Sequence, residues 1–123
     1  MVSAIVPIVK VSDIRESENF YCSVLGFAKD WEFALTPDGP WYVSLTLGGC
    51  FLHLSSFPGD GHGGAAVYFS VDEVDGLYNS FKQAGLEKAE LEPTDQAWGR
   101  RELYVRDPDG NCLRFGAPPA DAG

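Results

Sequence analysis

Apolar residues recur at helical spacing in two separate stretches of the chain, and each stretch follows a β-rich run. A glycine follows each stripe and is expected to end its helix, Gly26 in the first and Gly85 in the second. The apolar positions are Phe20, Tyr21, Val24 and Leu25 in the first stripe and Val74, Leu77, Tyr78 and Phe81 in the second. The pattern therefore predicts two amphipathic helices, roughly 60 residues apart.

Runs of β-branched and aromatic residues surround the first helix. Pro7 interrupts "AIVPIVKVSDI", which favours an edge strand or a strand that crosses to a partner, because proline cannot donate to a ladder. Asp13 and Glu16 have the spacing of a capping box at the helix start. Three more strands are expected at 29–35, 41–47 and 50–55, joined by the turns "TPDGP" and "LGG".

The second half of the chain repeats this order after the polar, glycine-rich connector "SSFPGDGHGG". "AAVYFSVDEV" reads as a strand that runs into an acidic helix start, and "AWGRRELYVRDPDGNCLRFG" reads as two strands with a tight turn. The chain thus divides into one βαβββ module at about 1–57 and another at about 64–118. Neither can bury a sheet face alone, so we expect a single α+β domain, residues 1–123, with a shared core.

Composition narrows the function classes. The chain has 123 residues, a net charge of −9 and an isoelectric point near 4.4. This acidity disfavours nucleic acid and suits a cationic small molecule, although it is also compatible with simple solubility. We expect no membrane span and no signal peptide, and hence a cytoplasmic protein. Three well-separated cysteines are expected to be buried, inert thiols rather than disulfides or metal ligands.

The stretch "VSDIRESENFYCSVLGF" and the turn "DPDGN" at 107–111, at this spacing, resemble the vicinal oxygen chelate superfamily. That superfamily includes glyoxalases, ring-cleaving dioxygenases and bleomycin resistance proteins, and the resemblance covers nearly the whole chain. It implies the glyoxalase/bleomycin resistance fold, in which paired βαβββ modules form a curled mixed sheet around a cavity, often in a dimer.

The resemblance also implies where a divalent metal would be held in the enzymes of this superfamily. Its ligand positions fall on Val6, His53, Ala66 and Arg114. Val6 and Ala66 carry no donor atom, Arg114 is cationic, and His53 alone cannot hold a divalent ion tightly. We therefore expect no metal, no cofactor and no catalytic residue, and we keep a metal-dependent lyase or dioxygenase as the alternative.

The segments "WGR", "RDPDGNC" and "VPIV" are similar to those of the bleomycin resistance proteins in particular. In that group the N-terminal strand is exchanged between protomers with a proline at the crossing, which implies a homodimer here; an ordinary edge strand is the alternative for Pro7. The implied function is non-catalytic sequestration of a bleomycin-type or related antibiotic in a groove of the homodimer, giving drug resistance. A structural or regulatory dimer with a vestigial cavity is a further possibility.

A cationic ligand with flat heteroaromatic rings needs aromatic plates and acidic groups. Trp31 and Phe33 alternate on one face of a strand, and Trp98 precedes Gly99, which would let the backbone approach a ligand closely. The predicted ligand-binding residues are Trp31, Phe33, Trp41, His53, Tyr68, Trp98, Gly99 and Arg114. The alternatives are core packing for the aromatic residues and a salt bridge to Glu102 for Arg114.

Overall fold

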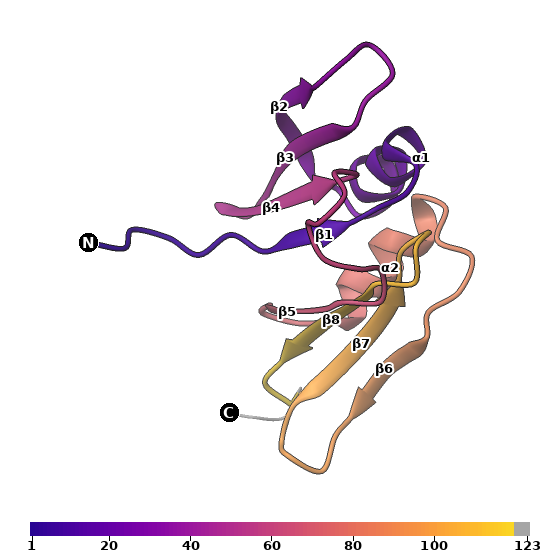
Figure 1. Cartoon of the computed structure of the whole chain (residues 1–123). Helices are drawn as coiled ribbons and strands as arrows, with labels where there is room; N and C mark the ends of the chain where they lie inside the picture. Colours follow the sequence, from indigo (N-terminus) through magenta and orange to yellow (C-terminus); the bar gives the residue numbers. More distant parts are fainter. Residues whose placement is uncertain (120–123) are drawn as a thin grey trace.

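The computed structural model describes residues 1–119 and consists of two four-stranded sheets, each accompanied by one helical segment (Figure 1). The first half contains β1 (Ile8–Lys10), α1 (Ile14–Asn19), the π-helical turn η1 (Phe20–Val24), β2 (Ala28–Ala34), β3 (Trp41–Leu47) and β4 (Cys50–Ser55). The second half contains β5 (Ala66–Ser70), α2 (Asp75–Gln83), β6 (Leu91–Asp95), β7 (Arg101–Arg106) and β8 (Cys112–Ala117). The predicted α+β fold with two βαβββ units is confirmed.

Both sheets have the same strand order, β1-β4-β3-β2 in the first and β5-β8-β7-β6 in the second. The first strand of each unit pairs in parallel with the last, and the other pairs are antiparallel. The register places Ile8 opposite His53 and Tyr68 opposite Arg114. These two pairs therefore occupy matching positions in the two sheets.

Helix α1 begins as the capping pattern predicts. The Asp13 carboxylate accepts hydrogen bonds from the backbone N–H groups of Arg15 and Glu16, both at 3.1 Å. The end of the helix differs from the prediction, because the chain widens into η1 and the Leu25 N–H donates to the Phe20 carbonyl, five residues back. The helix stops before Gly26, whose φ of +87° favours glycine.

The core lies between the helix-covered faces of the two sheets. Alternate residues of the central strands supply it, as the period of a strand requires. The buried strand residues are Val43 and Leu45 of β3, Leu52 and Leu54 of β4, Leu103 and Val105 of β7, and Leu113 and Phe115 of β8. Phe27 of the first half packs edge-on against Phe69 of the second, with ring centroids 6.1 Å apart. The halves share one apolar cluster, and the opposite face of each sheet is left open.

The "DPDGN" turn between β7 and β8 ties distant segments together through buried polar side chains. The Tyr21 hydroxyl donates to Asp107 Oδ2 at 2.8 Å, and Asn111 Nδ2 donates to the same oxygen at 2.8 Å. Asp107 Oδ1 accepts from the backbone N–H groups of Asp109 and Asn111. Burial and the nearby Asp107 charge raise the pKa of Tyr21, so its hydroxyl remains a donor throughout the physiological range.

Asn111 extends this network to both first strands. Its Nδ2 also donates to the Lys10 carbonyl of β1 at 3.0 Å. Its Oδ1 accepts from the backbone N–H groups of Gly64 and Ala65, at 3.0 and 2.9 Å, just before β5. The Asn111 side chain is fully buried, so its removal leaves these backbone groups without their buried partner.

Two expectations about the N-terminal half need correction. Strand β1 is shorter than the predicted β-rich run, because residues 1–7 form an extended arm that leads away from the sheets (Figure 1). Pro7 lies directly before β1, and its carbonyl accepts from the His53 N–H at 3.0 Å.

The second correction concerns the cysteines. All three cysteines are free thiols, but Cys50 is exposed and Cys22 is half-buried, so the prediction of buried thiols is right only for Cys112. Within residues 1–119 no helix has the length and apolar character needed to cross a membrane.

We expect Asn111→Ala to lower the free energy of unfolding by about 2–3 kcal/mol, because it strands the Lys10 carbonyl and two backbone N–H groups. Urea unfolding measures this directly. Asn79→Ala makes the same truncation on the exposed surface of α2 and serves as the matched control. Equal unfolding midpoints for the two variants would show that the network does not stabilise the fold.

Candidate functional site

The open face of the first sheet carries a cluster of aromatic rings. Trp31 of β2 and Tyr42 of β3 are stacked, with centroids 5.9 Å apart and planes 12° apart. His53 of β4 meets both rings edge-on, at 5.5 and 5.2 Å, and its Nδ1 lies 2.9 Å from the Tyr42 hydroxyl. The structure therefore brings Trp31 and His53, both predicted site residues, into one group.

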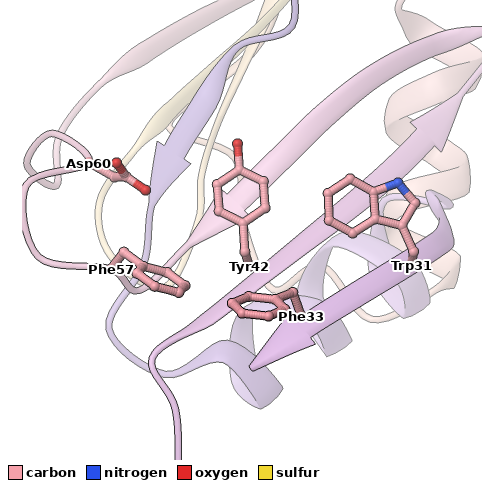
Figure 2. A pocket seen from close by; sticks show the side chains of 5 residues that line it. All are labelled: Trp31, Phe33, Tyr42, Phe57 and Asp60. Atoms are coloured by element: carbon pink, nitrogen blue, oxygen red, sulfur yellow. The ribbon is translucent and has the colours of Figure 1, made fainter. Parts of the chain in front are cut away.

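A second stacked pair extends this surface. Phe33 of β2 lies against Phe57, which follows β4, with centroids 6.2 Å apart and planes 17° apart. With Trp31, Tyr42 and Asp60, these rings line a shallow pocket of about 340 Å³ (Figure 2). Half of the Trp31 surface is exposed (50%) although the ring is held by its neighbours. We call the face formed by Trp31, Phe33, Tyr42, His53 and Phe57 the aromatic face.

Carboxylates stand beside the aromatic face. A β-bulge between Lys29 and Trp31 turns Asp30 to the open side, where its Oδ2 accepts from the hydroxyls of Ser44, at 3.1 Å, and Thr46. Asp60 Oδ2 accepts from the Ser55 hydroxyl at 2.7 Å. Neither carboxylate takes part in the ion pairs found within residues 1–119. Their negative charge is therefore available to a cation on this face.

The ionisable rings of the aromatic face are neutral at neutral pH. Burial lowers the pKa of His53, and the nearby charge of Asp30 only partly opposes this effect. Burial and the charge of Asp60 raise the pKa of Tyr42. The face therefore presents uncharged rings with negative carboxylates beside them.

Trp41 does not join this cluster. It shares the parity of Val43 and Leu45, packs against the core on the opposite face of β3, and lies 4.5 Å beneath the Arg15 guanidinium. Tyr42 occupies the open face instead, together with Ser44 and Thr46. The alternation of apolar and polar residues along β3 contains this signal, since the core positions of a strand predict which neighbour faces out.

The open face of the second sheet gathers the other predicted residues around one carboxylate. Glu102 of β7 accepts hydrogen bonds from the Tyr68 hydroxyl at 2.8 Å, from Trp98 Nε1 at 3.1 Å and from the Tyr104 hydroxyl at 2.7 Å. Sequence reasoning considered Glu102 only as a salt-bridge partner, because no local pattern shows that three donors converge on it. We call this group the Glu102 cluster.

Arg114 and Gly99 adjoin the Glu102 cluster. Arg114 points to the open face, opposite to Leu113 and Phe115, as the alternation predicts. Its guanidinium stacks 4.7 Å from the centre of the Tyr104 ring, and the ion pairs of residues 1–119 do not include a bridge to Glu102. Gly99 lies in the β6–β7 turn with a φ of +85°, so this turn itself favours glycine.

The residues at the superfamily's metal positions do not fit a metal. His53 and Arg114 lie on the open faces of their sheets, Ala66 begins β5, and Val6 lies in the arm before β1. Among these four residues, only His53 has a neutral atom, an imidazole nitrogen, that could ligate a metal. Within residues 1–119, no three or more His, Cys, Asp or Glu side chains are grouped as a metal site.

Charged side chains hold strand β2 on the side opposite to Trp31 and Phe33. Glu32 pairs with Arg15 of α1 at 2.6 Å and with Lys29 at 2.7 Å, and Lys29 also reaches Glu18 at 2.7 Å. Hydrogen bonds from Arg15 and Lys29 lower the pKa of Glu32 to about 2. This network fixes the edge strand to helix α1.

We expect Glu32→Gln to remove part of the acid sensitivity of folding. The folded-state pKa of Glu32 lies below its usual value near 4.5, so its contribution is present above about pH 4.5 and is lost as pH falls towards 2. Urea unfolding at pH 7 and pH 2.5 should show a wild-type advantage that shrinks at the lower pH. The exposed-site control Glu87→Gln should show no such difference, and a pH-independent effect of Glu32→Gln would contradict the assignment.

Comparisons with known proteins agree with this architecture. A family model described as "Glyoxalase superfamily protein" matches residues 1–120. The bleomycin resistance protein of Geobacillus stearothermophilus is 27% identical over 128 residues, covering 89% of this chain and 92% of that protein.

Solved structures share the same fold. The bleomycin resistance determinant encoded on the transposon Tn5 superposes with a TM-score of 0.74 at 21% identity, covering 96% of this chain and 99% of that one. Lactoylglutathione lyase from Agrobacterium tumefaciens superposes with a TM-score of 0.72 at 23% identity, covering 94% of each chain. These neighbours differ in their named activities, so function must be argued from the site.

Proposed function

This chain belongs to the glyoxalase superfamily, and within it we propose a non-catalytic binding protein that sequesters a cationic, flat aromatic antibiotic of the bleomycin type, giving drug resistance. The observation that carries the proposal is the stacked, half-exposed aromatic face with Asp30 and Asp60 beside it. The similarity to bleomycin resistance proteins supports the same ligand class.

The physical chemistry of the aromatic face suits such a ligand. A flat ring laid on Trp31 or Phe33 gains about 0.5–1.5 kcal/mol beyond the burial of its area, and a cation over an indole gains a similar amount. The carboxylates of Asp30 and Asp60 add attraction for a cationic tail, and the net charge of −9 favours its approach. Because these rings already pack on one another, little side-chain freedom is lost on binding.

Binding without turnover is favoured over a metal-dependent lyase or dioxygenase by the residues at the metal positions. Val6 and Ala66 have no donor atoms and Arg114 carries a positive charge, so the ligand set of those enzymes is missing. Addition of divalent cations to the purified protein separates the two functions. Metal-dependent turnover of a glutathione hemithioacetal or a catechol would overturn the proposal.

We further propose that the binding groove is completed in a homodimer with exchanged N-terminal strands. The aromatic face and the Glu102 cluster lie on open faces of different sheets, and a second chain can cover each of them. The arm at residues 1–7 supports this arrangement, since Ile5 is 90% exposed and Met1 and Val2 are also exposed. Residues 4–7 of the arm line an apolar cavity of about 500 Å³ together with the β3–β4 turn and β5, and the partner's arm would occupy this place after exchange.

Calorimetric titration with metal-free bleomycin tests the ligand. We expect about one ligand per protomer with micromolar or tighter affinity, and Trp31→Ala should weaken binding about tenfold through loss of the stacking plate. Trp41→Phe also removes one tryptophan, but from the opposite face, and should bind like the wild type. Absence of binding heat in the wild type would reject bleomycin, and equal affinity in Trp31→Ala would reject the aromatic face.

Sedimentation analysis tests the dimer. We expect the wild type to sediment as a dimer and Ile5→Asp to shift it towards the monomer, because a charge would be buried at the exchanged arm. Ala84→Asp places the same charge at an exposed apolar position at the end of α2, away from the arm and from both open faces, and should not change the distribution. A monomeric wild type, or equal behaviour of the two variants, would contradict the exchange.

A further inference from the structure

We infer that Glu102 is a positioning residue that holds the aromatic side chains of the second open face ready for the ligand. This inference rests on the proposed function, because it concerns the same binding groove. Glu102 itself is only 2% exposed and therefore acts through the side chains that it binds. Those side chains are Tyr68, Trp98 and Tyr104.

The three donors come from separate parts of the second half. Tyr68 lies on β5, Trp98 lies in the turn between β6 and β7, and Tyr104 lies on β7. All three bonds end on one carboxylate, with Tyr68 and Trp98 sharing Oε2 and Tyr104 using Oε1. Strand pairing positions the backbones of β5 and β7, and the shared acceptor then holds the three side chains in one arrangement.

The carboxylate is held in its charged form at neutral pH. Burial alone would raise the pKa of Glu102, but the hydrogen bonds from Tyr104, Trp98 and Tyr68 outweigh burial and lower it. A charged acceptor makes stronger hydrogen bonds than a neutral one. A buried carboxylate is also costly unless it is fully bonded, so the three donors and Glu102 require one another.

Trp98 is the side chain for which this matters most. It is 63% exposed, and an exposed indole in a turn is expected to exchange between rotamers unless something fixes it. The bond from Nε1 to Glu102 fixes one edge of the ring and leaves the rest of the indole accessible. A ligand that stacks on Trp98 then contacts an indole ring whose orientation is already fixed, so less side-chain entropy is lost on binding.

The sheet surface is built to allow this arrangement. A Cβ added at Gly116 of β8 would overlap the Tyr68 hydroxyl, so glycine leaves the space through which Tyr68 reaches Glu102. Arg100 fastens the same region, donating to the Gly116 carbonyl at 3.0 Å and to the Ser70 hydroxyl at 3.2 Å. Its Nε also lies 3.4 Å from the Tyr68 hydroxyl. Glu102 of β7, Gly116 of β8 and Arg100 of the β6–β7 turn therefore all help to position one phenol.

A ligand-free experiment tests the positioning directly. The chain has three tryptophans, so Trp31→Phe combined with Trp41→Phe leaves Trp98 as the sole indole reporter. In this background we expect Glu102→Gln to lower the fluorescence anisotropy of Trp98 and to increase its quenching by acrylamide about twofold or more. Glu92→Gln makes the same change, from a charged carboxylate to a neutral amide, in another glutamate–tyrosine pair, with Tyr78, and should leave both signals unchanged. Unchanged Trp98 signals in Glu102→Gln would overturn the inference.

A double-mutant cycle with bleomycin then connects positioning to binding. We expect Glu102→Gln alone to weaken binding about tenfold, and to have less than a twofold further effect once Trp98→Phe is present. Fully additive effects would show that Glu102 does not act through Trp98. If the wild type binds no bleomycin, the proposed function fails while the fluorescence result still decides the role of Glu102.

Gly116→Ala is a second variant that tests the cluster even if Glu102→Gln fails to fold. It leaves the carboxylate intact and displaces Tyr68, whose atoms lie nearest to the added Cβ, and urea unfolding checks that the variant is folded. Weaker binding in a folded Gly116→Ala variant supports the cluster as a positioning device. Wild-type affinity in that variant would remove Tyr68 from the inference.

Discussion

The buried hydrogen bonds around Asp107 and Asn111 are the constraint on which the arrangement of the two halves depends. A turn of the last hairpin binds the helix of the first half through Tyr21, and it binds β1 through the Lys10 carbonyl. The same asparagine accepts from the backbone before β5. These hydrogen bonds would be lost together if the halves moved apart, so the network specifies one arrangement as well as stabilising it.

This arrangement decides which surfaces remain available. The helix-covered faces of both sheets meet in a common core, where Phe27 of one half packs against Phe69 of the other. The opposite faces are therefore left to solvent or to another molecule. Apolar side chains are exposed there, including Trp31, Phe33, Phe51 and Tyr68, which is unusual for a surface with no partner.

The two open faces have different chemistry. The first presents stacked neutral rings beside the carboxylates of Asp30 and Asp60, which accept hydrogen bonds from neighbouring hydroxyl groups. The second presents an arginine stacked on a tyrosine and an indole fastened to a buried glutamate. The first face is therefore anionic at its margin, whereas the second combines a positive guanidinium with a buried negative carboxylate.

Local periodicity and turn chemistry are enough to predict the repeated βαβββ order, the Asp13 helix cap, the "DPDGN" turn and the outward direction of Arg114, and the structure contains all four. The sequence also identified Trp31 and Phe33 as neighbours on one strand face. The alternation along β3 also holds the direction of Trp41, although the prediction placed this residue in the site. The bulge that turns Asp30 outward, and the contribution of Phe57 and Asp60 to the pocket, follow only from strand pairing and loop packing. The convergence of Tyr68, Trp98 and Tyr104 on Glu102 likewise depends on strand register and on contacts between residues far apart in the chain, which no local pattern encodes.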